Sequence, residues 1–196
     1  MAFLRRAAQP VRGLGAIRLA LVMLLIALPM RAASGSEIRV GDRLPEVTLS
    51  DWQGRPMRLA SLRGEVVIID FWASWCKACV ALLPALNTIS REQGPAGLVV
   101  VAVSIDTTRS DAERFLAQHV PGVEMMLLHD PGGAVLARFG APGMPALYVV
   151  DADGTVRLVK AGYTTEELKT VEGFINELLS DASTAHKGGR NDDTNR

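Results

Sequence analysis

The chain contains two cysteines, Cys76 and Cys79, which lie three positions apart. Thiols at this spacing can form half of a metal site or a reversible disulfide that exchanges with other thiols. They are too few for a framework of several disulfides and too close in sequence to link distant parts of a fold. The pair therefore indicates chemistry more than structural support.

The residues before the pair favour redox chemistry. Val66 to Ile69 form a short apolar run rich in β-branched residues, as in a strand covered on both faces. Cys76 follows this strand after a short turn and is predicted to begin a helix. A helix amino terminus favours the thiolate, which is the nucleophile of disulfide exchange. Cys76 is therefore expected to attack, and Cys79 to resolve the mixed disulfide.

Metal binding is the alternative chemistry for two cysteines. A structural zinc site needs four ligands, but His119, His129 and His186 are not at ligand spacing from one another. A copper chaperone that uses both cysteines and His129 stays open as a rival, although a plain loop histidine is the simpler interpretation of His129. We expect no bound metal and no cofactor.

Alternating strand and helix signals surround the cysteines. A hairpin is predicted first, with strands at 46–50 and 57–59 around a Gln-Gly turn. Single strands and helices then alternate, and a second hairpin, around Asp153-Gly154, precedes the last helix. Capping boxes predict two helix starts, at Ser110 with Glu113 and at Thr164 with Glu167. The expected fold class is α/β, with a central mixed sheet flanked by helices and an added amino-terminal hairpin.

The two ends of the chain differ from this middle part. Four arginines precede an uncharged run from Leu19 to Met30, which is shorter than the ~20 residues that span a bilayer. Residues 1–36 are therefore expected to be a signal peptide, with an uncleaved membrane anchor as the alternative. Residues 37–180 are expected to form one domain, and the polar residues 181–196 a disordered tail.

The formal net charge of zero gives no basic field for nucleic acid, which is not expected as a partner. The leader places the domain in the periplasm or another extracytoplasmic compartment, with the membrane involved only through residues 1–36 if they are uncleaved.

The segment from Asp70 to Cys79, DFWASWCKAC, resembles the active site of the thioredoxin superfamily. Pro84 and the Gly143-Met144-Pro145 segment before a strand complete the resemblance. The stretch from Leu49 to Leu62, with Leu-Arg-Gly before the first central strand, is similar to the TlpA-like branch, which includes ResA and the reductases of cytochrome c maturation. The similarity covers roughly residues 39–179.

The resemblance implies a thioredoxin fold and an extracytoplasmic thiol-disulfide oxidoreductase with a redox-active Cys76–Cys79 disulfide. It further implies reduction of partner protein disulfides, with electrons from a membrane donor. Apocytochrome c, a copper-site protein and another exported thiol protein stay open as the partner. A thiol oxidase of exported proteins is the alternative in the same enzyme class. A peroxidase is disfavoured, because related peroxidases have threonine where this chain has Ala73.

The resemblance also assigns roles to residues outside the cysteines. Asp70 occupies the place of the buried acid of thioredoxin, and it is expected to be a general base for Cys79, with its pKa raised by burial. The simpler alternative is a wetted strand end. Pro145 is predicted to follow a cis peptide bond, and the Met144 backbone to pair with an extended substrate segment.

Trp75 is expected at the rim of the site and Trp72 in the core. Lys77 could stabilise the Cys76 thiolate or be a solvated lysine. Lys77-Ala78 lacks the proline common in the family, and Leu82 stands where ResA-like members have an acid. The reduction potential therefore cannot be transferred from relatives.

Overall fold

The computed structural model describes residues 37–190. The predicted leader lies outside the described residues. Within the described part, no helix combines the length and apolar character needed to cross a membrane.

Seven strands form one mixed sheet in the order β2-β1-β5-β4-β3-β6-β7. The central strand β3 (Val66–Trp72) pairs in parallel with β4 (Leu98–Ser104) and antiparallel with β6 (Ala146–Val150). β5 (Met126–His129) extends the parallel part, and β7 (Val156–Ala161) forms the edge beyond β6. The amino-terminal hairpin, β1 (Thr48–Asp51) and β2 (Pro56–Arg58), adds the other edge. The predicted fold class, hairpin included, is confirmed.

Every residue of β3 is buried, as its apolar run predicts. Alternate side chains point to opposite faces of a strand, and the two hydrophobic clusters follow this rule. Ile68 and Trp72 belong to the cluster on one face, whereas Ile69 and Phe71 belong to the cluster on the other. Asp70 alternates with Ile68 and Trp72 along β3, so its side chain lies on the same face of the sheet as theirs.

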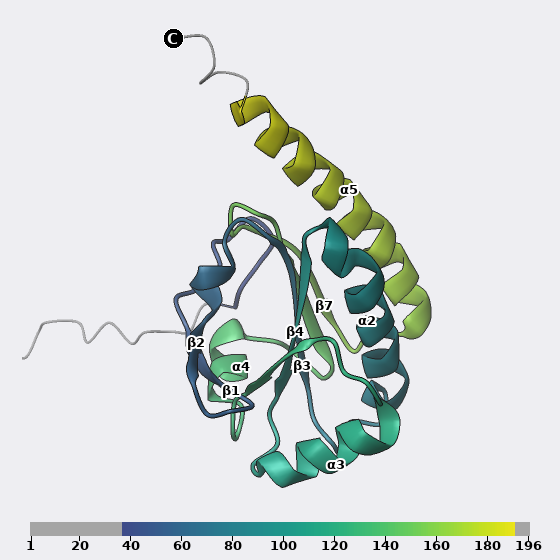
Figure 1. The fold of residues 1–196 in the computed structure, drawn as a ribbon. Helices are drawn as coiled ribbons and strands as arrows, with labels where there is room; N and C mark the ends of the chain where they lie inside the picture. Colours follow the sequence, from purple (N-terminus) through teal and green to yellow (C-terminus); the bar gives the residue numbers. More distant parts are fainter. Residues whose placement is uncertain (1–36, 191–196) are drawn as a thin grey trace, which may run out of the picture. The chain divides into compact units, whose positions relative to one another are not determined.

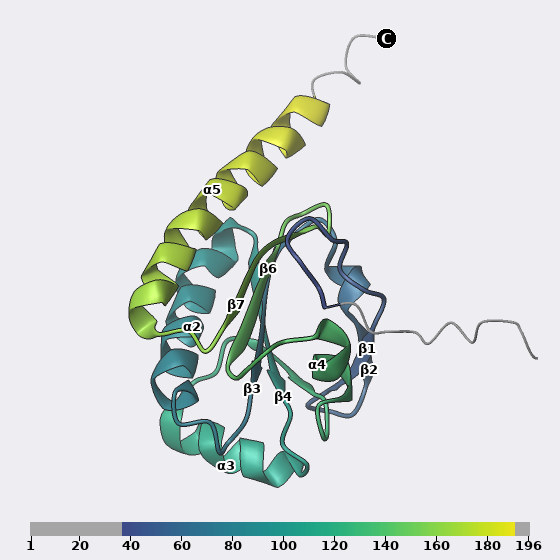
Figure 2. The ribbon, with the colours of Figure 1, turned by 180° about the vertical axis from the view of Figure 1, so that it is seen from behind.

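Helices α2 (Cys79–Gln93), α3 (Arg109–His119) and α5 (Thr165–Arg190) cover this first face. The short helix α4 (Ala134–Phe139) and the 3₁₀ turn Leu59–Leu62 lie over the other. Figures 1 and 2 show α2 and α5 side by side on the same side of the sheet, with α4 opposite them. A second 3₁₀ turn, Gly94–Ala96, leads from α2 to β4.

Two helix boundaries test the capping predictions. At α5, the Glu167 amide donates to the Thr164 hydroxyl and the Thr164 amide donates to the Glu167 carboxylate, so this capping box is confirmed. At α3 the prediction was wrong: Thr108 is the N-cap and its hydroxyl donates to Asp111, while Ser110 lies inside the helix. The Thr108 side chain accepts no hydrogen bond from a helix amide, so no capping box forms at this end of α3.

The prediction of a disordered tail from residue 181 also needs correction. α5 continues to Arg190, so residues 181–190 are helical and not a disordered tail. The Ser183 and Thr184 hydroxyls donate to carbonyls three residues earlier, a contact that helical geometry permits without an apolar face. The last turns of α5 extend past the end of the sheet, which explains their polar composition (Figure 1). Residues 191–196 lie outside the described part.

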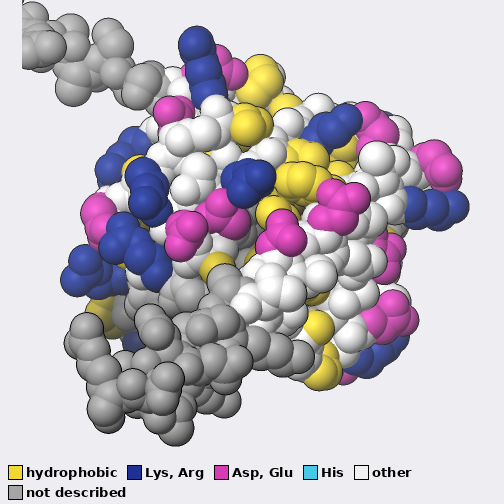
Figure 3. Space-filling view, turned by 90° about the horizontal axis from the view of Figure 1, so that it is seen from above, with side chains coloured by type: hydrophobic (Ala, Val, Ile, Leu, Met, Phe, Trp, Pro, Cys, Tyr) yellow, Lys and Arg dark blue, Asp and Glu magenta, His cyan; other side chains and the backbone are white. Residues whose placement is uncertain are grey.

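Surface charges are mixed on the face that Figure 3 shows, where cationic and anionic side chains are interspersed with small apolar patches. In the described part of the chain, Glu46 pairs with both Arg58 and Arg63. This face therefore has no single-sign field, in keeping with the zero net charge of the chain.

Candidate active site

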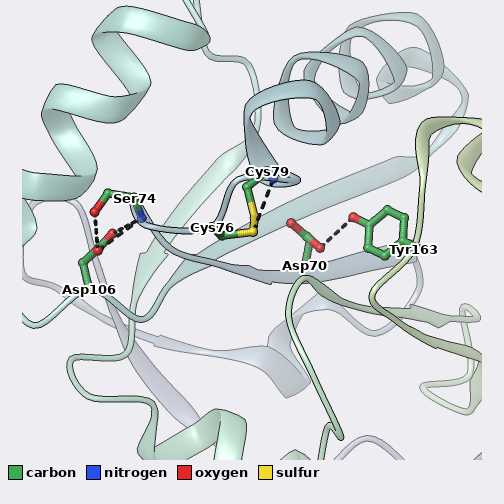
Figure 4. The surroundings of a disulfide bond; sticks show 6 residues. All are labelled: Asp70, Ser74, Cys76, Cys79, Asp106 and Tyr163. Atoms are coloured by element: carbon green, nitrogen blue, oxygen red, sulfur yellow. Dashed lines mark hydrogen bonds between the residues drawn. A yellow bond between two sulfur atoms is a disulfide. The ribbon is translucent and has the colours of Figure 1, made fainter.

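Cys76 and Cys79 form a disulfide at the start of α2, with an S–S distance of 2.10 Å and a Cα–Cα distance of 5.4 Å. The helix begins at Cys79, three residues later than predicted, and Cys76 lies in the preceding turn. The Cys79 amide donates to the Cys76 sulfur at 3.3 Å (Figure 4). Cys76 is 7% exposed and Cys79 is fully buried, so Cys76 is the sulfur that a partner can reach.

Asp70 is fully buried on β3, on the sheet face that α2 covers. Figure 4 shows its carboxyl group between the disulfide and Tyr163, with one oxygen on each side. The Tyr163 hydroxyl donates to Oδ1 at 2.8 Å, and Oδ2 has no hydrogen-bond partner among residues 37–190. Burial raises the pKa of Asp70 to about 8, against the opposing effect of the Tyr163 hydrogen bond. Asp70 is thus not a wetted strand end.

Tyr163 is a site residue that the sequence did not reveal. It lies 93 positions from Asp70, in the segment between β7 and α5, and it is itself buried. Burial, and secondly the Asp70 carboxylate, raises the pKa of Tyr163 well above its ordinary value. The tyrosine therefore stays protonated and donates to Asp70. No local motif marks such a partner, because only the packing of the last segment against β3 brings the two together.

A second buried carboxylate, Asp106, holds the turn that carries Cys76. It accepts hydrogen bonds from the Ser74 amide and hydroxyl and from the Ser104 hydroxyl, at 2.7 to 3.2 Å. Ser74 precedes Cys76 by two residues, so the contact fixes the position of the reactive turn (Figure 4). The signal for Asp106 was present in the sequence, because this acid directly follows the apolar run from Leu98 to Ile105.

Replacing Asp106 with Ala is expected to lower the free energy of unfolding by about 2–4 kcal/mol, because the buried Ser104 hydroxyl and the partly buried Ser74 amide and hydroxyl would lose their acceptor. Urea unfolding of the oxidised protein measures the effect. Glu177→Ala, an exposed carboxylate on α5, is the matched control and is expected to change stability by less than about 0.5 kcal/mol. Equal effects of the two substitutions would contradict the positioning role.

His129, the histidine considered for copper, lies at the end of β5. Its Nε2 is 2.7 Å from the Asp106 carbonyl oxygen, and its ring contacts the Trp52 ring edge-on. The imidazole is thus engaged in packing around the Asp106 turn. Among residues 37–190, no group of three or more His, Cys, Asp or Glu side chains is arranged to hold a metal ion.

The predicted substrate-contacting residues lie in two segments of the chain, next to Cys76 and before β6. The Met144-Pro145 peptide bond is cis, as predicted. Pro145 is buried and directly precedes β6, whose first two residues, Ala146 and Leu147, pair with Phe71 and Asp70. Met144 is half-buried, and Lys77 is exposed. Trp75 is 64% exposed beside Cys76.

Trp72 has the core position that the sequence predicted. It is fully buried, and its ring packs against Phe115 of α3 with ring centroids 5.2 Å apart. The two tryptophans of the active-site motif thus have different environments, and Trp75 is the one available to a partner.

This chain is similar to known proteins. Residues 40–159 match the AhpC/TSA family. The thiol-disulfide oxidoreductase ResA of Bacillus anthracis is 25% identical over 146 residues, which cover 74% of this chain and 82% of that protein. ResA of Geobacillus thermodenitrificans is 29% identical over 130 residues, 66% of this chain and 74% of that protein.

A solved structure described as thiol:disulfide interchange protein DsbE from Chlorobium tepidum superposes with a TM-score of 0.68 at 33% identity. The alignment covers 73% of this chain and 99% of that one. These similarities agree with the disulfide at the start of α2 and with the sheet order around it. The chain therefore belongs to the AhpC/TSA family within the thioredoxin superfamily, and it is a thiol-disulfide oxidoreductase.

Proposed function

We propose that the protein is an extracytoplasmic protein-disulfide reductase, which passes two electrons from the Cys76–Cys79 dithiol to a disulfide of a partner protein. The observation that supports reduction of the partner, and not its oxidation, is the burial of Cys76 and Cys79 next to Asp70. A strong oxidant needs a strongly stabilised thiolate in its reduced form. Apolar burial of Cys79 next to an acid disfavours a thiolate, so the dithiol releases its electrons readily.

The reaction proceeds in two exchanges. The Cys76 thiolate attacks one sulfur of the partner's disulfide; a Cys76–partner disulfide forms, and the other partner sulfur leaves as a thiolate that takes up a proton. Cys79 then loses its proton to Asp70 and attacks the Cys76 sulfur. The Cys76–Cys79 disulfide forms, the mixed disulfide breaks, and the second partner sulfur leaves with the electron pair. The partner gains two electrons, and this protein loses two.

Asp70 is the general base of the second exchange in this proposal. Its free oxygen faces the disulfide, and a pKa of about 8 lets the carboxylate form near neutral pH and accept a proton. Around it, the Met144 backbone pairs with an extended partner segment, Pro145 and Trp75 border that segment, and the exposed Lys77 follows Cys76 in the chain.

The Asp70→Asn variant tests this role. Resolution of a preformed Cys76 mixed disulfide is expected to slow by about 10²-fold or more near pH 8, because the positioned base is lost. Stopped-flow measurement across pH should show a wild-type rate that rises with an inflection at about pH 8, and a slower rate without this inflection for Asn. Tyr163→Phe, which removes the hydrogen bond that lowers the Asp70 pKa, should move the wild-type profile to higher pH. Equal resolution rates for wild type and Asn across this range would refute the role.

Export, a membrane electron donor and a substrate such as apocytochrome c complete the proposal, and they rest on the leader and on the ResA relatives. Residues 1–36 fused to alkaline phosphatase, an enzyme that needs disulfides to be active, should give activity in a Gram-negative host. The same fusion without residues 1–36 is the control. Equal activity of the two fusions would contradict export by this segment.

A further inference from the structure

A groove of about 400 Å³ lies between the active-site turn and α3. Cys76 forms part of one wall, together with Trp75 and Lys77, and Arg114 and His119 of α3 line the other side. A partner segment that continues past a sulfur bonded to Cys76 can therefore enter the groove. The roles proposed above for Met144 and Pro145 do not use this surface.

The charges in the groove do not cancel. Its carboxylate, Asp111, is already engaged, because it pairs with Arg114 and accepts a hydrogen bond from Thr108 at 2.6 Å. Lys77 is exposed and forms no ion pair within residues 37–190. Within the described residues, the groove thus contains a cation without a neutralising anion, Lys77, at the residue that follows Cys76.

Apolar surface adjoins this cation. Trp75 and Val80, 64% and 42% exposed, are two of the three large apolar side chains exposed in the described part of the chain, and both line the groove. Exposed aromatic and apolar side chains that gather at one place mark interaction sites on soluble proteins. The groove therefore combines an apolar contact with a positive charge.

We infer that this groove binds the partner segment next to the reactive cysteine and selects segments in which an apolar side chain is accompanied by Asp or Glu. The apolar side chain packs on Trp75 and Val80, and the carboxylate lies near Lys77. This inference rests on the proposed exchange with partner proteins and adds the chemistry of the segment that is preferred. A charge at a solvent-exposed rim acts mainly on association, so the preference appears in the exchange rate and weakens with salt.

Two peptides test the inference. Each carries one cysteine as a mixed disulfide with thionitrobenzoate and one neighbouring leucine, and they differ only in flanking Glu or Lys residues. Reaction with the reduced full chain is followed by release of thionitrobenzoate at about 20 mM and about 500 mM salt. The ratio of the two rates is the readout, because a change in reduction potential affects both peptides alike.

At low salt, the Glu peptide is expected to react about three- to tenfold faster than the Lys peptide, and the ratio should approach one at high salt. Lys77→Glu should invert the ratio. Lys169→Glu, the same charge change on exposed α5, is the matched control and should leave the ratio unchanged. Trp75→Ala should slow both peptides and preserve the ratio.

Equal rates of the two peptides with wild type, or equal shifts with Lys77→Glu and Lys169→Glu, would overturn the groove preference while leaving the proposed reductase standing. If neither peptide reacts with the reduced chain, both the exchange with partners and the groove preference fail. The outcomes of the test therefore separate the two proposals.

Discussion

At about pH 9, the oxidised Asp70→Asn variant is expected to be more stable than the unchanged protein by about 3 kcal/mol or more. Asp70 has an ordinary pKa of 3.8 and a pKa of about 8 in the folded chain, with burial as the cause. A group whose pKa is higher in the folded than in the unfolded state adds to the free energy of unfolding when the pH is below its unfolded pKa. This contribution is lost as the pH rises through the folded pKa. The difference between the two pKa values of Asp70 corresponds to a loss of about 6 kcal/mol in the free energy of unfolding between about pH 4 and about pH 8. Asn carries no such charge.

Urea unfolding between about pH 5 and about pH 9 measures this effect. The unchanged protein should lose stability across this window, and Asp70→Asn should lose much less. Asp181→Asn, at an exposed position of α5, is the matched control and should follow the unchanged protein. Parallel curves for Asp70→Asn and the unchanged protein would show that the pKa of Asp70 is not raised in the folded state.

Single cysteine substitutions are expected to have opposite consequences for partner trapping. Cys79→Ser leaves the reachable sulfur, so it should form a mixed disulfide with a partner and fail to release it. Cys76→Ser leaves only the fully buried sulfur, so exchange should fall to background. Mass spectrometry after reaction with a disulfide-containing protein measures the covalent complex. Equal trapping by the two variants would contradict the assignment of Cys76 as the attacking sulfur.

The sequence predicted the sheet and the reactive pair because both depend on local patterns. The apolar run of β3 requires cover on both faces, and it places Asp70 and the following turn at one end of a buried strand. The capping box at Thr164 likewise acts within four residues. Such signals can be read without knowledge of the neighbours in space.

The partners of the buried acids could not be predicted in this way. Tyr163 reaches Asp70 only when the chain returns along β7, and Asp106 reaches Ser74 only because β3 and β4 end at the same edge of the sheet. The length of α5 was underestimated for a related reason. A helix that extends beyond the core loses its apolar face, and its sequence then resembles that of a disordered tail.

The reduction potential of the Cys76–Cys79 pair tests the proposed function most directly. It is measured by equilibration of the full chain with defined dithiothreitol or glutathione buffers. The burial of the pair over Asp70 predicts a value near that of thioredoxin, about −270 mV, so that the dithiol reduces partner disulfides. A value near about −120 mV would identify an oxidant of exported thiols and would contradict the proposed reductase.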